Sequence, residues 1–397
     1  MGGGGVQTFE VPSGTNVFDW TVPKEWNIRG GYIETPDGEK IIDFKNTNLH
    51  ILGYSTPINQ IISREELLEH IYTLPDQPDI IPYVTSYYSE RWGFCMSEKQ
   101  KQALDQEKYH VVIDSSLENG HLTYGEVILP GESQEEVFFS TYICHPSMAN
   151  NELSGPVVVT NLIKYIQSLS KRHYTYRFVF IPETLGSIVY LSRNLEKMQK
   201  NVKAGFVVTC VGDDRAYSYV ASRYANTLAD KVAKNVLKHH APDYVSYSFL
   251  ARGSDERQYC SPGVDLPVCS ICRTKYGKYP EYHTSADNLS LISEAGLQGA
   301  FDVYRKICEA LELNYFYKIN CKCEPQLGKR GLYPTISMKG GLYDEVRIMT
   351  NFLAYADGTN DLIDISNIIN QPIERIAPFL GKLIDNQLIS VNVAVEK

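Results

Sequence analysis

The sequence predicts an α/β fold in which a mainly parallel sheet is flanked by helices. From about residue 135 onward, apolar runs of strand length alternate with segments of helical periodicity. Strands that alternate with helices of roughly ten or more residues are typical of βαβ units, whose strands lie parallel. The chain has 397 residues, and this length predicts two to three domains. We therefore expect smaller modules beside the α/β domain.

Four apolar runs are the expected parallel strands. They lie at residues 137–144, 174–182, 205–211 and 266–272. Helical patterns follow each of them, at 157–169, from 187, at 226–240 and from 290. Cys269 and Cys272 have CxxC spacing, but they lie inside the fourth apolar run, which indicates a strand interior and no metal site.

The regions on either side of this alternation have different patterns. Up to about residue 130, short alternating runs such as 40–44 and 109–113 predict a mostly β region with one helix near 63–72. Residues 331–397 show three helical patterns, at 344–355, 362–369 and 373–386, and a β-like tail at 388–395. Three helices and a strand fit a winged helix or a similar small module.

Charge and composition narrow the functional classes. The net charge of −9 argues against a general nucleic-acid-binding surface. Residues 331–397 carry 5 Lys and Arg against 8 Asp and Glu, so we favour a docking role for this module over DNA binding. No run approaches roughly 18 apolar residues, so no transmembrane helix is expected. The 28 Tyr against 14 Phe fit a saccharide- or peptide-facing surface, or a half-buried core.

The nine cysteines and the first residues of the chain bear on the compartment. The start, five residues of Met and Gly, has no basic segment followed by an apolar one and is not a signal peptide. Nine is an odd number, and the cysteines are spread through apolar runs. We therefore expect reduced thiols and a cytoplasmic protein, with a homo-oligomeric state left open.

The carboxyl ends of parallel strands are where a site is expected, because loops and helix N-termini meet there. His145 follows the first predicted strand, Glu183 the second, Asp213 the third, and the loop after the fourth carries His283. Two neutral imidazoles and a carboxylate, with an open fourth position for water, suit catalytic Zn²⁺. A further carboxylate within hydrogen-bond reach would act as general base.

The candidates for these roles are His145, Glu152, Glu183 and His283. Each assignment has a structural alternative. His145 could be held by a backbone carbonyl, and Glu152 could complement a helix N-terminus. Glu183 could pair with Arg177 or Arg193, and His283 could bond Asp287.

The polar segment 252–257 precedes the fourth predicted strand. Arg252 or Arg257 could hold a substrate carboxylate, and Asp255 could bind substrate or orient a ligand histidine. The alternative for each is a solvated turn. Tyr282, together with Tyr142 and Tyr279, flanks the predicted ligand histidines, and either contacts substrate or packs the site.

Seven motifs along the chain resemble the bacterial aminopeptidase-like proteins with a C-terminal winged helix, which are often encoded among surface-polysaccharide genes. They are 18–26 (FDWTVPKEW), 48–55 (NLHILGYS), 86–94 (SYYSERWGF), 142–155 (YICHPSMANNELSG), 182–187 (PETLGS), 253–263 (GSDERQYCSPG) and 282–289 (YHTSADNL). The resemblance covers essentially the whole chain. It implies a zinc-aminopeptidase-like domain at 6–40 and 131–325, an inserted β-rich domain of protease-associated type at 41–130, and a winged helix at 331–397.

The resemblance also implies site residues and departures from the family's two-zinc site. His145 fits the first ligand histidine and His283 the last. The bridging-Asp position falls on Asn151, the Glu pair is reduced to Glu183, and a further Asp position falls on Thr209, with Asp213 nearby. Asn is neutral and cannot bridge two Zn²⁺ ions as a carboxylate does. A single zinc on His145, Glu152 and His283, with Glu183 as the catalytic base, is therefore the sharper expectation.

Two functional hypotheses follow from these patterns. The first is a single-zinc hydrolase of an amide or peptide bond, with a small peptide or an aminoacylated or acylated sugar as substrate. The second is a catalytically decayed peptidase scaffold that binds a ligand or a protein. A DNA-binding regulator would need a basic face on the terminal module.

Overall fold

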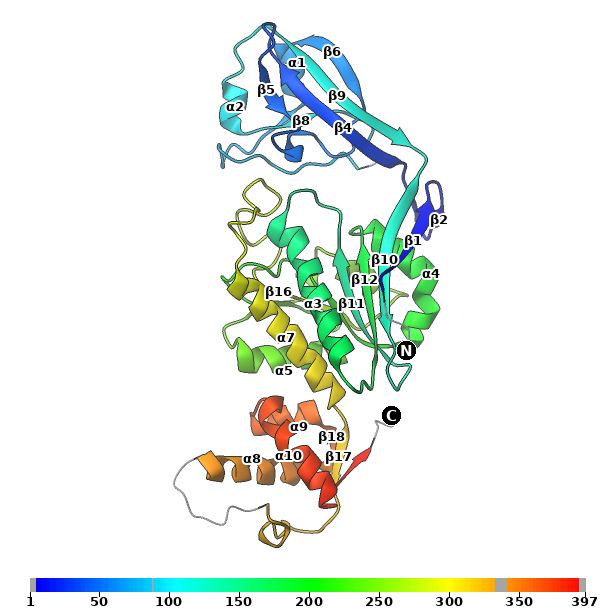
Figure 1. Ribbon diagram of the computed structural model, residues 1–397, viewed down its shortest axis with the longest axis vertical. Coiled ribbons are helices and arrows are strands. Elements are labelled where there is room, and N and C mark those ends of the chain that lie inside the picture. The colour runs from blue at the N-terminus through cyan, green and yellow to red at the C-terminus, as the bar shows by residue number, and fades with distance from the viewer. Residues whose placement is uncertain (1–4, 88, 333–340, 393–397) are drawn as a thin grey trace. The chain divides into compact units, whose positions relative to one another are not determined.

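The computed structural model describes residues 5–87, 89–332 and 341–392 (Figure 1). The start of the glycine leader, residues 1–4, and the end of the predicted tail, residues 393–397, lie outside this part. The chain forms two compact units. The first comprises 1–225 and 245–301, and the second comprises 226–244 and 302–397.

The first unit contains an eight-stranded sheet in the order β1-β10-β12-β11-β13-β16-β14-β15. Its centre, β12-β11-β13-β16, is parallel, and antiparallel pairs lie on both sides of it. The strands are β1 (Gln7–Pro12), β10 (His121–Leu129), β11 (Glu136–Tyr142), β12 (Thr175–Ile181), β13 (Val202–Val207), β14 (Ser218–Val220), β15 (Val245–Tyr247) and β16 (Val268–Cys272). The predicted α/β class with a mainly parallel sheet is confirmed, and Cys269 and Cys272 lie inside β16 as predicted.

Helices flank this sheet, as the 3.6-residue periodicity predicted. In Figure 1, α3 and α7 lie on one side of the sheet and α4 on the other. Their bounds, with the short α6, are α3 (Ser154–Ser168), α4 (Leu185–Asn201), α6 (Glu256–Tyr259) and α7 (Glu294–Glu312). Buried residues of α4, including Ile188 and Leu191, join Phe138, Val179 and Val268 of the strands in one apolar core, so burial of these faces fixes the strand ends relative to the helices.

A buried ion-pair network ties the sheet to α4. Arg177 of β12 is 1% exposed and binds both carboxylate oxygens of Glu136, from Nε at 2.6 Å and Nη2 at 2.7 Å. Its Nη1 donates to Glu126 at 2.7 Å and to the Tyr190 hydroxyl at 2.8 Å. Arg177 is thus committed to structural partners and is not available to Glu183.

A smaller four-stranded sheet, β5-β4-β9-β6, also belongs to the first unit. Its strands are β4 (Glu25–Glu34), β5 (Lys40–Asp43), β6 (Ile58–Ser63) and β9 (Lys108–Glu118). Alternate residues Tyr109, Val111 and Ile113 of β9 are buried in its core, as a strand with one covered face requires. This sheet begins at Glu25 and ends at Glu118, whereas the sequence placed the limits of the insertion at 41 and 130.

Short elements complete the first unit. They are β2 (Asn16–Val17), β3 (Trp20–Thr21), β7 (Ile71–Tyr72), β8 (Phe94–Cys95), α1 (Arg64–Glu69) and α2 (Glu98–Gln102). Ser63 caps α1 by accepting from the Glu66 amide, which satisfies one amide that the first helical turn leaves free.

The second unit combines one helix from an earlier part of the chain, α5, with the C-terminal winged helix. Its elements are α5 (Leu228–His240), β17 (Phe316–Ile319), α8 (Gly341–Tyr355), β18 (Asp357–Asp361), α9 (Leu362–Ile369), α10 (Ile373–Asp385) and β19 (Ile389–Asn392). β17 is the central strand of a sheet with β18 and β19. Asp361 starts α9 with a capping box and also pairs with Lys231 of α5 at 2.6 Å. The three predicted C-terminal helices are confirmed, and no helix in the described ranges is long and apolar enough to cross a membrane.

Candidate metal and catalytic site

The loop after β11 carries the first predicted ligand. The strand ends at Tyr142, and the chain then passes through Cys144 and His145 into a π-helical turn, Ala149–Leu153, that leads directly into α3. This turn places Glu152 beside His145. A Cβ at Gly155 would lie 2.4 Å from Thr141 Oγ1 and 2.5 Å from the Val208 carbonyl. Only glycine therefore lets the start of α3 approach the sheet this closely.

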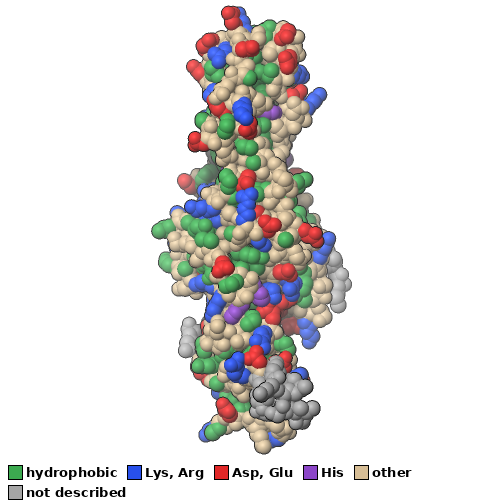
Figure 2. Space-filling view, turned by 90° about the vertical axis from the view of Figure 1, so that its left-hand side faces the viewer, with side chains coloured by type: hydrophobic (Ala, Val, Ile, Leu, Met, Phe, Trp, Pro, Cys, Tyr) green, Lys and Arg blue, Asp and Glu red, His purple; other side chains and the backbone are tan. Residues whose placement is uncertain are grey.

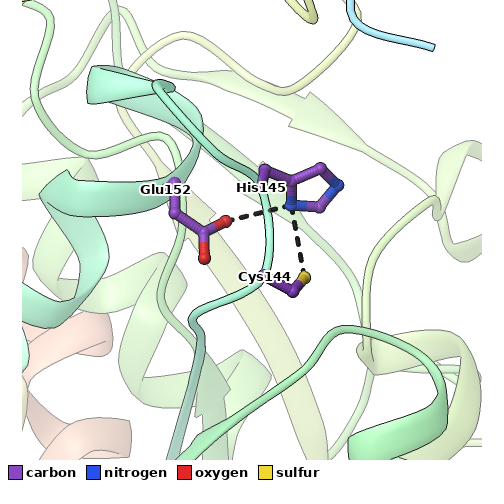
Figure 3. Close-up of side chains that lie close together, drawn as sticks. All are labelled: Cys144, His145 and Glu152. Atoms are coloured by element: carbon purple, nitrogen blue, oxygen red, sulfur yellow. Dashed lines mark hydrogen bonds and ion pairs between the residues drawn. The ribbon is translucent and has the colours of Figure 1, made fainter. Parts of the chain in front are cut away.

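Three potential metal-ligand side chains gather in this loop (Figure 3). His145 Nδ1 lies 2.9 Å from Glu152 Oε2 and 3.4 Å from Cys144 Sγ. One potential ligand atom from each of the three residues lies within 4.8 Å of the others. The structure thus brings together His145 and Glu152, as predicted, and adds Cys144, which sequence reasoning had grouped with the buried thiols.

His283 faces His145 from the loop after β16. The two imidazole centroids are 5.0 Å apart, and the ring of Tyr282 stacks on His283 at 3.9 Å. His283 has a left-handed backbone with φ of 56°, and its Nε2 is buried without a hydrogen-bond partner among the described residues. No hydrogen bond of the described chain joins His283 to Asp287, whose carboxylate accepts instead from the Asn150 and Asn151 amides. The loop-bond alternative for His283 is therefore wrong.

Glu183 reaches the same histidine from the end of β12. Its Oε2 lies 3.6 Å from His145 Nε2. The following residue, Thr184, has φ of 63° and ψ of −74°, a conformation that β-branched residues rarely adopt. The Thr184 amide donates to Asp255 Oδ1 at 2.7 Å, and Arg257 binds the Thr184 hydroxyl. Asp255 and Arg257 therefore hold the turn that presents Glu183.

Burial shifts every ionisable group of this cluster toward its neutral form. It lowers the pKa of His145 to about 4, and burial with the nearby His145 lowers that of His283 to about 3. Burial raises the pKa of Glu152 to about 8, and burial with the charge of Asp255 raises that of Glu183 to about 8. Neutral imidazoles are the form that binds metals, and a bound cation would favour the ionised form of the neighbouring carboxyls.

Unpartnered buried atoms provide a test of whether a metal fits here. Of eight buried side-chain polar atoms without a hydrogen bond in the described residues, six belong to this cluster and its supports. They are Asn151 Oδ1, Glu152 Oε1, Ser254 Oγ, Asp255 Oδ2, Arg257 Nε and His283 Nε2. Buried polar groups are almost always partnered in native proteins. The free lone pair of Glu152 lies in the group with Cys144 and His145 that could hold one metal ion. His283, which presents a free lone pair beside this group, is not among the described side chains whose ligand atoms lie within 4.8 Å of one another.

A second metal lacks the carboxylates that it would need. Asn151 donates from Nδ2 to the Tyr142 hydroxyl at 2.7 Å, and Thr209 bonds the same hydroxyl at 2.5 Å. Asp213 is buried, and its carboxylate accepts from Asn150 and Thr274. These partners leave the position of the bridging Asp occupied by a neutral amide, in keeping with a single-metal site.

The remaining predicted residues divide into buried and exposed ones. Asp255 is fully buried and bonds Thr184 and Ser187, with no hydrogen bond to a histidine among the described residues. Burial raises its pKa to about 7. Arg252 is exposed, and its guanidinium lies over the Phe249 ring at 4.7 Å. It has no contact with the cluster in the described structure.

Tyr83 is a site residue that the sequence did not indicate. Its ring packs edge-on against both His145, at 5.3 Å, and His283, at 5.4 Å. Burial and the nearby Cys144 raise the pKa of its hydroxyl above the ordinary value, so it remains a neutral donor. The adjacent motif at 86–94 was noted in the sequence, but it gave no sign that this segment contacts the strand-end loops.

Comparisons with known proteins identify relatives of both parts of the chain. Residues 4–314 match a family described as a domain of unknown function, DUF4910, and residues 315–391 match a winged helix-turn-helix family. A Clostridium acetobutylicum protein provisionally described as a polysaccharide biosynthesis protein with an aminopeptidase-like domain is 46% identical over 375 residues, which are 94% of this chain and 85% of that protein.

Solved structures extend the similarity. A crystal structure from Clostridium acetobutylicum, provisionally described as a peptidase, is 43% identical, with a TM-score of 0.91 over 98% of this chain and 88% of that one. A zinc aminopeptidase of Bacillus subtilis is 13% identical, with a TM-score of 0.55 over 77% of this chain and 84% of the other. At this identity the likeness concerns the fold alone. The large sheet and its helices have the fold of the zinc aminopeptidases, and a winged helix follows them in the chain.

Proposed function

This chain belongs to the family described as a domain of unknown function, DUF4910, and we propose that it is a single-zinc hydrolase of an amide or peptide bond. The observation that carries the proposal is the pairing of His145 with Glu152 opposite the unpartnered Nε2 of His283. Glu183 lies 3.6 Å from the same imidazole. Three ligands and one nearby carboxylate are the complement of a hydrolytic zinc site.

The residues of the cluster have separable roles. His145, Glu152 and His283 would hold the zinc, which when bound acts as a Lewis acid and activates water. Glu183 would accept a proton from the attacking water at its carboxylate and deliver it to the leaving amine. Tyr282 would keep the ring of His283 in its orientation by stacking. Asp255 would fix the turn after Glu183.

The substrate is proposed to be a small peptide or an acylated or aminoacylated sugar. The relative from Clostridium acetobutylicum is described in terms of polysaccharide biosynthesis, which favours a sugar. For the winged helix we propose a docking role over DNA binding, because its residues 331–397 carry a net charge of −3. On the face shown in Figure 2, Lys and Arg side chains are interspersed with Asp and Glu.

The experiment combines a zinc count with a search for turnover. Protein purified without chelator is expected to hold about one zinc per chain by elemental analysis. His283→Ala should lose the zinc and the activity, while His121→Ala, a substitution of an exposed histidine of β10, should keep both. Glu183→Gln should keep zinc and lose hydrolysis of aminoacyl-naphthylamides and N-acyl amino sugars. Zinc-free protein, or activity that survives complete chelation, would refute the proposal.

The second candidate is a binding protein on a decayed peptidase scaffold. The neutral Asn151 in place of a bridging carboxylate is the observation that favours it. It predicts that wild-type protein turns over no amide, and that ligand affinity is the same in wild type and in Glu183→Gln.

A further inference from the structure

A cleft of about 470 Å³ lies beside the candidate catalytic cluster. One wall comes from the segments 71–75 and 82–84, which follow the small sheet's helix α1, and the other comes from residues 282–284. Pockets that bind small organic ligands have volumes of about 300–1,000 Å³. The cleft is therefore large enough for one ring-sized group and its substituents.

The two walls are joined by backbone contacts. The Tyr83 amide donates to the His283 carbonyl at 2.8 Å, and Pro82 forms a β-bridge with Thr284. The Ile81 amide donates to Ser285 Oγ at 3.0 Å, and the Ser285 amide donates back to the Ile81 carbonyl at 2.8 Å. Backbone hydrogen bonds thus fix the wall from the small-sheet region against the loop that carries His283.

The cleft shares two residues with the catalytic cluster. His283 lines the cleft, and its ring centroid is 5.0 Å from that of His145. Tyr83 also lines it and contacts both imidazoles edge-on. A group bound in the cleft would therefore adjoin the catalytic cluster through His283 and Tyr83, since His145, Glu152 and Glu183 are not part of the lining.

The lining is uncharged and rich in hydroxyl-bearing rings. It contains no Lys, Arg, Asp or Glu. Tyr72, Tyr83 and Tyr282 present apolar faces with polar tips, next to Thr73 and Thr284. Arg91 lies over the Tyr72 ring, 5.5 Å from the centroid, but is not part of the lining.

These features select a particular class of ligand. A cationic group would find no counter-ion in the lining and would face a zinc ion held by His283, so its desolvation would be uncompensated. A purely aliphatic group would offer no partner to the tyrosine hydroxyls, whereas the hydroxyls of Thr73 and Thr284 already donate to Glu98 and to the Glu281 carbonyl. An uncharged pyranose has apolar C–H faces that stack on aromatic rings and an equatorial belt of hydroxyls that such groups can bond.

We propose that this cleft binds an uncharged pyranose ring of the substrate and directs an N-acyl group carried on that ring toward His283 and Glu183. The inference rests on the proposed function and specifies its substrate class as an N-acyl amino sugar. In the reaction, water adds its oxygen to the acyl carbon, and the bond from that carbon to nitrogen breaks. The amine takes up the proton, and the acyl group leaves as a carboxylic acid.

Binding can be measured separately from turnover. The probe is the methyl glycoside of N-acetylglucosamine, titrated calorimetrically into full-length, zinc-loaded Glu183→Gln protein, in which hydrolysis is blocked. The methyl glycoside of glucosamine, in its protonated ammonium form, serves as a charged comparison and N-acetyl-phenylalaninamide as an aromatic amide without a sugar. The neutral glycoside is expected to bind at least about tenfold more tightly than either comparison.

Substitutions in the cleft locate the binding site. Adding Tyr72→Ala should weaken glycoside binding about tenfold, and Leu74→Trp, which fills the cleft, should abolish it. Tyr72→Phe should retain most of the affinity, and Tyr224→Ala, a substitution of an exposed tyrosine outside the cleft, should leave it unchanged. Unchanged affinity in both Tyr72→Ala and Leu74→Trp would overturn the proposal, as would tighter binding of the phenylalaninamide.

Failure of this inference differs from failure of the proposed function. If wild-type protein binds the glycoside in the cleft but hydrolyses no amide, the cleft assignment stands and the hydrolase proposal fails. If it hydrolyses aminoacyl-naphthylamides with zinc bound but does not bind the glycoside, the hydrolase proposal stands and the cleft assignment is refuted.

Discussion

Asp255 offers the sharpest test of how the structure positions Glu183. Its Oδ1 accepts from the Thr184 amide at 2.7 Å and from Ser187 Oγ at 2.9 Å. These two bonds hold Thr184 at φ of 63°, where the backbone is strained by about 1–3 kcal/mol. Asp255→Ala removes the oxygen that accepts both bonds, so the strained turn can relax and the carboxylate of Glu183 moves away from His145.

The expected effect can be bounded from these contacts. Leaving a buried donor without its acceptor costs about 1–3 kcal/mol, and relaxation of the turn is driven by a strain of similar size. We expect kcat/KM to fall about 10- to 100-fold, which corresponds to roughly 1.4–2.8 kcal/mol of transition-state stabilisation. Zinc content should not change, because Asp255 is not one of the proposed ligands.

Asp255→Asn is the matched control, since its amide oxygen can accept the same two hydrogen bonds. It should lower kcat/KM by less than about threefold. Hydrolysis rates, elemental zinc and thermal melts would be measured on both variants and wild type. The reasoning is refuted if Asp255→Asn is as damaging as Asp255→Ala, or if Asp255→Ala loses its zinc.

Three further predictions follow from other parts of the structure. Arg177→Met leaves Glu126 and Glu136 buried without their partner and should lower the free energy of unfolding, measured in urea, by about 3–5 kcal/mol. Substitution of the exposed Arg29 by Met should have little effect. A decrease below about 1 kcal/mol for Arg177→Met would contradict the assigned network. Burial raises the pKa of Glu374, but hydrogen bonds from His240 and Lys306 outweigh this effect and lower the pKa to about 2. The stabilisation by these bonds is therefore present above the ordinary pKa of 4.5 and is lost as the pH falls toward 2. The Tm difference between wild type and Glu374→Gln should shrink over this pH range, and a constant difference would refute the assignment. Chelation should lower the Tm, and added zinc at a thousandfold excess over its Kd should restore about 4 kcal/mol of stability, whereas magnesium should not.

The sequence predicted the strands and helices of the α/β region and of the winged helix well because both have clear periodicities. The predicted strand at 174–182 corresponds to β12 (Thr175–Ile181), and the predicted helix at 362–369 coincides with α9. The position of Glu183 near His145 followed from the rule that strand ends converge. These features depend on local pattern and on the geometry common to parallel sheets.

Features that depend on distant segments could not be predicted in this way. Tyr83 lies in a stretch without regular periodicity, and its place against His283 is set by backbone bonds to residues about two hundred positions later. Cys144 was grouped with the other thiols, although its position directly before His145 was a usable signal. Arg252 was named for its charge, which gives no information on whether a side chain points into a cluster or into solvent.

The pairing of β1 with β10 has a consequence for the order of folding. Pro12 lies opposite His121, so forming this pair from the unfolded chain closes a loop of roughly a hundred residues. The ladder of β4 and β9 sets Glu25 opposite Glu118, and once it exists the same loop is only about fourteen residues long. Because loop-closure entropy grows with the logarithm of length, this lowers the cost of closure by about 2 kcal/mol. The small sheet should therefore form before the edge of the large one, and variants that weaken its core should slow the folding of the whole first unit.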